Sequence, residues 1–228
     1  MNGIRLLKKI PFLSALSAKH LREVYRLAHE LSLDRRQSVF SKREDADAMF
    51  IVLSGRVKIF TNSASKKRKT FAYLKEGEFF GEMALVEGTT RTAAAQAVEP
   101  SRLMVIRKTD FQRLLSREPR LALYLLRTVS ARLRRANEEI EGLLFRNILG
   151  RVAKAMLDLS RRSGEERNGA VILKERYTQQ ELADIVGTTR EPLTRALSSL
   201  RRAGLVELRD ERYLIPSTDK LARLCIET

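Results

Sequence analysis

The sequence predicts an α+β protein with three parts: an N-terminal antiparallel β-barrel or jelly roll, one long helix, and a C-terminal winged helix-turn-helix. Three observations predict it. Short β-rich runs separated by turn residues fill residues 34–105, an unbroken helical pattern follows from 120 to about 146, and two short helical patterns joined by a glycine turn precede a hairpin in residues 177–215. We therefore expect domains at 1–118, 119–146 and 147–228.

The composition narrows the class of protein. The 228 residues include 44 basic and 28 acidic ones, and the net charge of +16 favours a polyanionic partner, either nucleic acid or a membrane surface. The chain has no apolar run long enough to cross a bilayer and no recognisable signal peptide, so we expect a cytoplasmic protein without a membrane partner. One cysteine, Cys225, and two histidines argue against a metal cofactor. No nucleophile–base pair is apparent, so we expect no catalytic residues and no enzyme.

The N-terminal half reads as a helix followed by strands. Residues 15–32 carry leucines and a valine at steps typical of a short amphipathic helix. MFIVLSGRVKIF then places a Ser-Gly turn between two β-rich runs, which is a hairpin signature. The runs SVF, TFAYL, EFFG, AAAQAV and RLMVI lie around it at short intervals. So many short strands within about seventy residues are typical of a small barrel or jelly roll. SASKKRK is expected to be a solvated hairpin tip.

The long helix carries a narrow apolar seam with charged neighbours. Such a stripe suits a two-helix coiled coil, although a helix lying on its own barrel is the alternative. We expect a homodimer through the seam residues Leu126, Val129, Leu133, Ala136, Ile140 and Leu143.

The C-terminal segment has the signals of a helix-turn-helix. Thr178 and Glu181 stand at capping-box spacing, and Gly187 ends the first helix. Thr188 and Thr189 are N-cap candidates for the second helix, and Glu191 is at capping-box spacing from Thr188. GLVELRDERYLI then predicts two strands around a turn, a β-hairpin wing.

The second helix divides into two faces. One is apolar, and the other holds Arg190, Glu191, Thr194 and Arg195 near its N-terminal end, which is the end that enters the major groove in such motifs. An arginine fork matches the acceptors of guanine, and a carboxylate accepts from cytosine. We therefore expect double-stranded DNA as a partner. The expected contact residues are Thr178, Thr188, Thr189, Arg190, Glu191, Thr194 and Arg195.

TTREPLTRAL, together with the barrel and the long helix, resembles the cyclic-AMP receptor protein/fumarate–nitrate regulator (CRP/FNR) family of bacterial transcription factors, over nearly the whole chain. The resemblance implies a regulator that reads a TGTGA-like palindrome through Arg190, Glu191 and Arg195. We also expect a contact with RNA polymerase. SGEERNG is one candidate surface for that contact, and an ordinary solvated linker or loop is the alternative.

GEMALVEGTTRTA resembles the phosphate-binding cassette of cyclic-nucleotide domains. A cyclic phosphate needs a positive partner with fork geometry, and Arg91 supplies one. Gly81 allows a close approach of the main chain, Glu82 can accept from the ribose 2′-hydroxyl, and Thr92 can donate to the phosphate. Met83 and Ala84 complete the expected site. An Arg91 side chain sealed away from any phosphate would argue against this ligand.

The base end of the expected nucleotide site is less defined. Aligning the heptads with the family places Ala136 and Asn137 against the base, and Asn137 suits adenine or guanine. The expected effector is cyclic AMP, with cyclic GMP as the alternative. Other hypotheses are an empty cassette in which Glu82 pairs with Arg91, a family member with a different effector or none, a redox or haem sensor, and a cyclic-nucleotide regulatory subunit.

Overall fold

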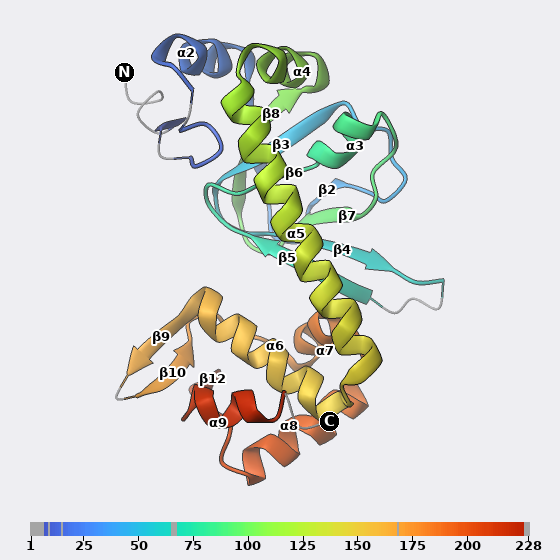
Figure 1. The fold of residues 1–228 in the computed structure, drawn as a ribbon, viewed down its shortest axis with the longest axis vertical. Helices are drawn as coiled ribbons and strands as arrows, with labels where there is room; N and C mark the ends of the chain where they lie inside the picture. The colour runs from blue at the N-terminus through green and yellow to red at the C-terminus, as the bar shows by residue number, and fades with distance from the viewer. Residues whose placement is uncertain (1–6, 9, 15, 65–67, 168, 226–228) are drawn as a thin grey trace. The chain divides into compact units, whose positions relative to one another are not determined.

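The computed structural model describes residues 7–8, 10–14, 16–64, 68–167 and 169–225 (Figure 1). The chain forms two compact units. The first contains residues 1–61 and 70–132, and the second contains residues 62–69 and 133–228. The expected separate domain at 119–146 is therefore one helix whose two halves belong to different units. Residues 65–67 of the expected hairpin tip lie outside the described residues.

The first unit is built on two four-stranded sheets, as the run of short β-rich segments predicts. One has the order β1-β8-β3-β6 and the other β2-β7-β4-β5. The strands are β1 (His29–Leu33), β2 (Ser38–Phe40), β3 (Ala48–Ser54), β4 (Val57–Asn62), β5 (Arg68–Leu74), β6 (Phe79–Phe80), β7 (Ala94–Ala97) and β8 (Ser101–Arg107). Neighbours such as β3 and β8 pair antiparallel.

Strand β3 shows how this unit is layered. Because side chains alternate across a strand, Phe50 and Val52 join an apolar core shared by both sheets, whereas Met49 and Ile51 join a second core. That second core includes residues of α2 (Ala18–Leu27), α4 (Lys108–Arg117) and the start of α5 (Pro119–Phe145). Both faces of β3 are therefore buried, which explains its continuous apolar sequence.

The expected helix at residues 15–32 is wrong at its C-terminal end. Helix α2 has Ser17 as its N-cap and Ala28 as its C-cap, and the chain continues as β1. Residues His29 to Leu33 pair antiparallel with β8, from His29 opposite Val105 to Leu33 opposite Ser101. Over so short a segment the apolar positions fit the periodicity of a helix as well as that of a strand. The segment forms a strand because it can pair with the edge of β8.

Helix α5 confirms the unbroken helical pattern and runs for 27 residues. Leu121 and Leu125 in its first turns are buried in the core of the first unit. None of the helices in the described part of the chain is long and apolar enough to span a membrane.

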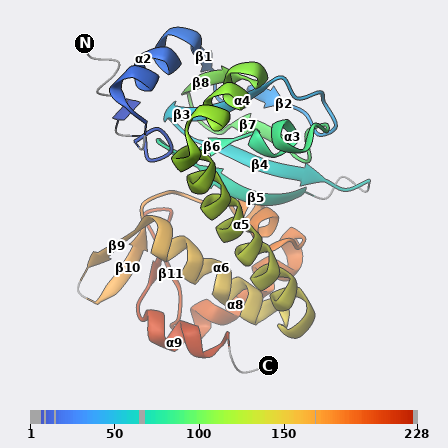
Figure 2. The same cartoon turned by 45° about the horizontal axis from the view of Figure 1, so that its top comes forward.

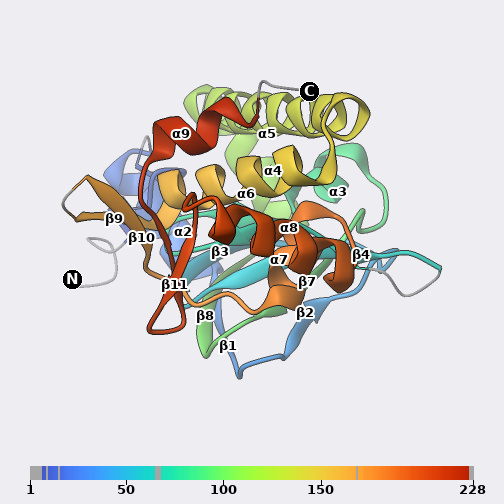
Figure 3. The ribbon, with the colours of Figure 1, turned by 90° about the horizontal axis from the view of Figure 1, so that it is seen from below.

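The second unit contains the predicted helix-turn-helix and wing. Figure 3 shows α7 and α8 side by side next to α6. Its elements are α6 (Ile148–Ser163), β9 (Gly164–Arg167), β10 (Ala170–Leu173), α7 (Gln179–Val186), α8 (Arg190–Arg202), β11 (Glu207–Arg209), β12 (Arg212–Ile215) and α9 (Thr218–Arg223), with sheet order β11-β12-β10-β9.

Two local expectations in this unit need correction. SGEERNG is not a plain loop, because Ser163 ends α6 and Gly164–Arg167 form β9, which pairs with β10 ahead of Gly169, whose φ is +79°. Thr188 does not cap α8. The N-cap is Thr189, and its side chain makes no capping hydrogen bond. The capping box of Thr178 and Glu181 is confirmed.

Candidate functional site

The cassette of residues 81–92 begins with a glycine that the geometry requires. Gly81 is the N-cap of α3 (Glu82–Glu87) and has a φ of +83°, in the left-handed region. A Cβ atom at this position would also lie 2.8 Å from Nη1 of Arg91. Any side chain would therefore strain the backbone and collide with the guanidinium. Figures 1 and 2 both show α3 at the end of the unit where β2 and β7 lie.

The Arg91 side chain is buried, with only 3% of its surface exposed. Its Nη1 donates to the Gly81 carbonyl at 2.8 Å, and its Nη2 donates to the Ala48 carbonyl at 2.6 Å. The guanidinium carbon lies 4.3 Å from the ring centroid of Phe40 and 5.7 Å from that of Phe50. Burial lowers the pKa of Arg91, while the carboxylates of Asp47, Glu44 and Glu82 oppose this. In this arrangement the fork is occupied by main-chain carbonyls and is not open to a phosphate.

The chemistry of the site nevertheless matches an anionic ligand with a hydroxyl group. Nε of Arg91 and Oε2 of Glu82 are buried polar atoms without a hydrogen-bond partner among the residues that the structure describes. The first is a donor suited to a phosphate oxygen, and the second is an acceptor suited to a hydroxyl. The hydrogen-bonding groups of these residues therefore match those of a cyclic nucleotide. Binding through Arg91 requires the guanidinium to exchange carbonyl oxygens for phosphate oxygens.

Glu82 is held by a residue of α5. Its side chain is 1% exposed, and its Oε1 accepts from Nη1 of Arg132 at 2.5 Å. Nη2 of Arg132 donates to the Phe79 carbonyl at 2.6 Å, and its guanidinium lies over the Phe79 ring. Burial raises the pKa of Glu82, and Arg132 offsets part of that shift. The alternative in which Glu82 pairs with Arg91 is therefore not the arrangement observed.

The remaining residues expected at the nucleotide are spread over both units. Within the cassette, Ala84 is buried, whereas Met83 and Thr92 are exposed. Ala136 and Asn137 are exposed on the half of α5 that belongs to the second unit. The α5 residue that the structure brings to the cassette is Arg132.

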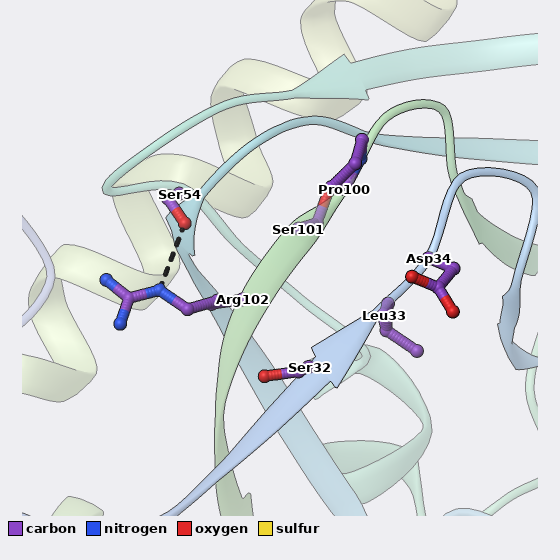
Figure 4. A pocket seen from close by; sticks show the side chains of 7 residues that line it. All are labelled: Ser32, Leu33, Asp34, Ser54, Pro100, Ser101 and Arg102. Atoms are coloured by element: carbon purple, nitrogen blue, oxygen red, sulfur yellow. Dashed lines mark hydrogen bonds between the residues drawn. The ribbon is translucent and has the colours of Figure 1, made fainter.

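A hollow of about 430 Å³ lies elsewhere on the first unit. It is lined by Ser32, Leu33, Asp34, Ser54, Pro100, Ser101 and Arg102 (Figure 4). Its single arginine is already engaged, because Nε of Arg102 donates to the Ser54 hydroxyl and Nη1 pairs with Glu30 at 3.2 Å. None of the expected ligand residues lines it.

The charged side chains near the start of α8 are exposed to solvent. Arg190, Glu191 and Arg195 are exposed, while Leu193, Ala196, Leu197 and Leu200 are buried against the rest of the unit. Arg195 donates to Glu191 at 2.6 Å, one helical turn away. The predicted division of this helix into an apolar and a polar face is present in the structure.

The four threonines expected at DNA are not equivalent. The Thr178 hydroxyl accepts from the Glu181 N–H and lies 2.9 Å from the Glu181 carboxylate, so the cap of α7 uses it. Thr189 is exposed, and Thr188 is half-buried. Thr194 is half-buried and contacts Gln179, a residue that the sequence does not single out.

Most of the expected dimer seam is exposed in the single chain. Leu126 and Leu133 are 62% and 61% exposed, and Ile140 and Leu143 are at least half exposed. Ala136 is also exposed. Val129 differs, because it packs partly against the core of its own unit. Helix α5 therefore presents an apolar stripe that the described part of its own chain leaves uncovered.

Arg132 is the site residue that sequence reasoning misses. It immediately precedes the seam residue Leu133, and among so many arginines of α5 nothing in its spacing distinguishes it. A buried glutamate that needs a cation is the only sequence-level signal, and the identity of that cation depends on how α5 crosses the cassette.

Comparison with known proteins agrees with both halves of the chain. The family described as "Cyclic nucleotide-binding domain" matches residues 30–118, and the one described as "Crp-like helix-turn-helix domain" matches residues 150–224. A "CRP-like cAMP-activated global transcriptional regulator" of Mycobacterium tuberculosis is 30% identical over 189 residues, which cover 83% of this chain and 84% of that protein.

Two further comparisons bear on fold and effector. The "Cyclic AMP receptor protein" of Thermus thermophilus is 34% identical over 170 residues, covering 75% of this chain and 76% of that protein. A solved structure of the c-di-GMP-responsive global regulator CLP from Xanthomonas campestris matches with a TM-score of 0.76 and 26% identity, covering 87% of this chain and 99% of that one. Regulators named for different nucleotides therefore share this architecture.

Proposed function

The chain belongs to the CRP/FNR family of transcription regulators, and we propose that it is a homodimer that reads a palindromic operator with TGTGA-like half-sites under the control of cyclic AMP. Membership makes it a DNA-binding transcription regulator with a cyclic nucleotide-binding domain, and not an enzyme. The homodimer, the half-site sequence and the identity of the nucleotide are the proposed parts.

The DNA-reading part rests on the exposed polar face of α8. Arg190 and Arg195 can each present a fork to a guanine, and Glu191 can accept from a cytosine amine. Glu191 already makes an ion pair with Arg195, so the two side chains are preset on one side of the helix. A glutamate in a surface meant only for phosphates would weaken binding, which favours base reading.

The observation that carries the regulatory part is the contact of Arg132 with Glu82. It ties the cassette helix α3 to α5, and α5 continues without a break into the unit that contains α8. A ribose 2′-hydroxyl that donates to Glu82 would change the surroundings of the Arg132 side chain. Glu82 and Arg132 thus give α5 a way to respond when the cassette is occupied.

Arg91 is expected to bind the phosphate after leaving the carbonyls of Ala48 and Gly81. The negative charge of a cyclic phosphate supplies the attraction that these neutral carbonyls lack. The exposed Asn137 is the proposed base contact. Cyclic AMP is favoured because the relatives from Mycobacterium tuberculosis and Thermus thermophilus are named for it.

The second copy in the proposed dimer is expected to cover the exposed stripe of α5. The stripe has coiled-coil spacing, and its leucines and isoleucine would otherwise face water. A contact of the β9–β10 hairpin with RNA polymerase stays a prediction.

One series of titrations tests the regulatory proposal. The affinity for an operator duplex is measured with cyclic AMP, cyclic GMP, c-di-GMP and no nucleotide. Coupling in such systems changes DNA affinity by about 5- to 150-fold, and we expect a change in this range with cyclic AMP that is lost in Arg132→Gln. Equal DNA affinity under all four conditions would contradict nucleotide control.

A regulator that acts without a nucleotide is the second candidate. The observation in its favour is that Arg91 and Glu82 already have partners within the chain, namely the two carbonyls and Arg132. The same titrations separate the two, because this candidate binds the operator with full affinity when no nucleotide is added.

A further inference from the structure

The junction between α5 and α6 is short, and the segment at the end of α9 lies against it. Residues 146 and 147 are all that separates the two helices. Asn147 is used locally as the N-cap of α6, where its side chain accepts from the Gly150 N–H at 3.0 Å. Arg146 is bound elsewhere, because its Nε donates to the Cys225 carbonyl at 3.1 Å. All of these residues belong to the second unit.

The position of that carbonyl is fixed by α9. Figures 1 and 3 show α9 beside α6, against which it packs, and Leu221 of α9 is fully buried. The N–H of Cys225 donates to a carbonyl of α9, so Cys225 is held at the end of this helix. A Cβ atom on Gly150 of α6 would lie 3.2 Å from the Leu224 carbonyl, which shows how closely the end of α9 approaches α6. The acceptor for Arg146 is therefore attached to α6.

Arg146 also lies against the last turns of α5. Its N–H donates to the Gly142 carbonyl at 3.1 Å, one turn earlier. A Cβ atom on Gly142 would lie 2.7 Å from Nη1 of Arg146. Glycine inside a helix is less favourable than alanine, but here it leaves room for the guanidinium. Arg146 therefore connects the end of α5, through α9, to α6.

The orientation of α6 matters for DNA reading because α6 holds the helix-turn-helix. It packs against both α7 and α8. Nη2 of Arg151, near the start of α6, donates to the Val186 carbonyl at 2.9 Å and to the Gly187 carbonyl at 3.2 Å. These carbonyls lie where α7 ends and the turn to α8 begins, and a cation stabilises the C-terminal end of a helix. A change in the angle between α5 and α6 would therefore move α8 relative to α5.

We propose that Arg146 is a positioning residue that fixes the angle between α5 and α6 through α9, and thereby determines which half-site spacing the regulator accepts. The proposal rests on the homodimer and on the DNA reading proposed above. In a twofold dimer the seam of α5 lies at the centre, and each copy of α8 reads one half-site. The distance between the two recognition helices then follows from the angle that Arg146 fixes.

Operator duplexes that differ only in the spacing of their half-sites test this role. Affinity is measured, with and without cyclic AMP, for the preferred spacing, for spacings one base pair shorter and longer, and for a single half-site. Arg146→Met keeps an unbranched stem and removes the donor. We expect it to lower the ratio of affinities for preferred and shifted spacings by about 2- to 30-fold, the range in which single residues change coupling between sites. Arg146→Lys keeps the charge without the fork and should lie between.

The controls separate the angle from the reading surface. Arg146→Met should bind a single half-site as the wild type does, because the polar face of α8 is unchanged. Arg151→Met loosens the turn itself, so it should weaken binding to a single half-site and to every spacing alike. Arg223→Gln is the matched control on α9, since it removes an exposed positive charge, and it should leave the spacing ratio unchanged.

Several outcomes would overturn the proposal. A wild-type protein without a spacing preference, or a wild-type ratio in Arg146→Met, excludes the role of Arg146. Equal losses at every spacing with a weaker salt dependence show that Arg146 contacts phosphate directly. Thermal unfolding checks each variant. If Arg146→Met does not fold, Arg146→Lys decides, and a wild-type ratio in that variant overturns the proposal as well.

Failure of the proposed function gives a different result. Light scattering that finds a monomeric wild-type protein contradicts the homodimer, and absence of binding to a single half-site and to every operator contradicts the DNA reading. A dimer that binds the operator, but whose spacing ratio does not depend on Arg146, contradicts this inference alone.

Discussion

The cassette and the recognition helix both combine glutamate with arginine, and they place these residues in opposite environments. In the cassette, Glu82 is 1% exposed and Arg91 is 3% exposed. On α8, the side chains of Glu191 and Arg195 are 79% and 69% exposed. The same chemical groups are therefore withdrawn from water in one region and left in water in the other.

The difference in burial suggests a difference in use. A buried charge loses its hydration, so it must keep its partners, and moving it requires replacing all of them together. Arg91 and Glu82 therefore suit a switch with two defined arrangements. An exposed charge exchanges partners at little cost, because water competes with every contact. Glu191 and Arg195 therefore suit a surface that contacts DNA, because the two side chains can give up their ion pair at little cost.

The largest expected effect is the loss of stability when the buried arginine of the cassette is replaced. Arg91→Ala removes the donors to the Ala48 and Gly81 carbonyls and leaves a gap beside Phe40. We expect the free energy of unfolding to fall by about 3 kcal/mol or more, since two charge-assisted hydrogen bonds are lost. Urea denaturation measures it. Arg91→Lys keeps the charge without the fork and should lie in between. If Arg91→Ala has the same free energy of unfolding as the wild type, the buried contacts of Arg91 do not stabilise the fold.

The next effect concerns the exposed arginine that is expected to read a base. Arg190→Ala should weaken operator binding by about 1–3 kcal/mol and relax the preference at one base pair. Its free energy of unfolding should stay near the wild-type value, because the side chain is exposed. Binding to a panel of single-base operator variants provides the measurement. A uniform loss across the panel would mean that Arg190 contacts phosphate only.

The buried glutamate should leave a signature in the pH dependence of stability. Burial raises the pKa of Glu82 above its ordinary value of 4.5, so just above that pH the folded chain holds a proton that the unfolded chain has released. More protons on the folded state mean that the contribution of Glu82 to stability falls as pH rises through the window above 4.5. Glu82→Gln should remove this contribution. Unfolding of both proteins is compared across the pH range, and identical pH profiles would contradict the shift.

The smallest effect is expected for the exposed pair. Replacing Glu191 with Gln removes the ion pair with Arg195. We expect the free energy of unfolding to change by no more than about 0.5 kcal/mol, the usual range for an exposed pair one helical turn apart. Differential scanning calorimetry in low and high salt checks it. A loss as large as that of Arg91→Ala would erase the contrast between the two regions.

The sequence predicted those elements that are specified by residues close to one another in the chain. The capping box at Thr178, the glycine turn at Gly187 and the hairpin of the wing within GLVELRDERYLI all occur where expected. Strand β1 and helix α9 could not be predicted in the same way. The first depends on pairing with β8, and the second packs on α6, far away in the sequence.

The cassette shows the same limit at the level of single residues. Its motif predicts which residue types gather there, because glycine, glutamate and arginine stand at the spacing of a phosphate-binding turn. It does not predict that Arg91 donates to carbonyls of its own chain, since Ala48 lies on a strand 43 residues earlier. It also does not predict Arg132, which α5 delivers from 50 residues later.

The sequence by itself determined the succession of β-rich domain, long helix and winged helix-turn-helix, the family and the two sets of polar residues, because turns, caps and periodicity act between near neighbours. The tertiary structure alone decided the state of each charge. Whether a guanidinium meets water, a carbonyl or a carboxylate depends on which distant segments enclose it, and the hydration that it loses there makes its contacts either fixed or exchangeable.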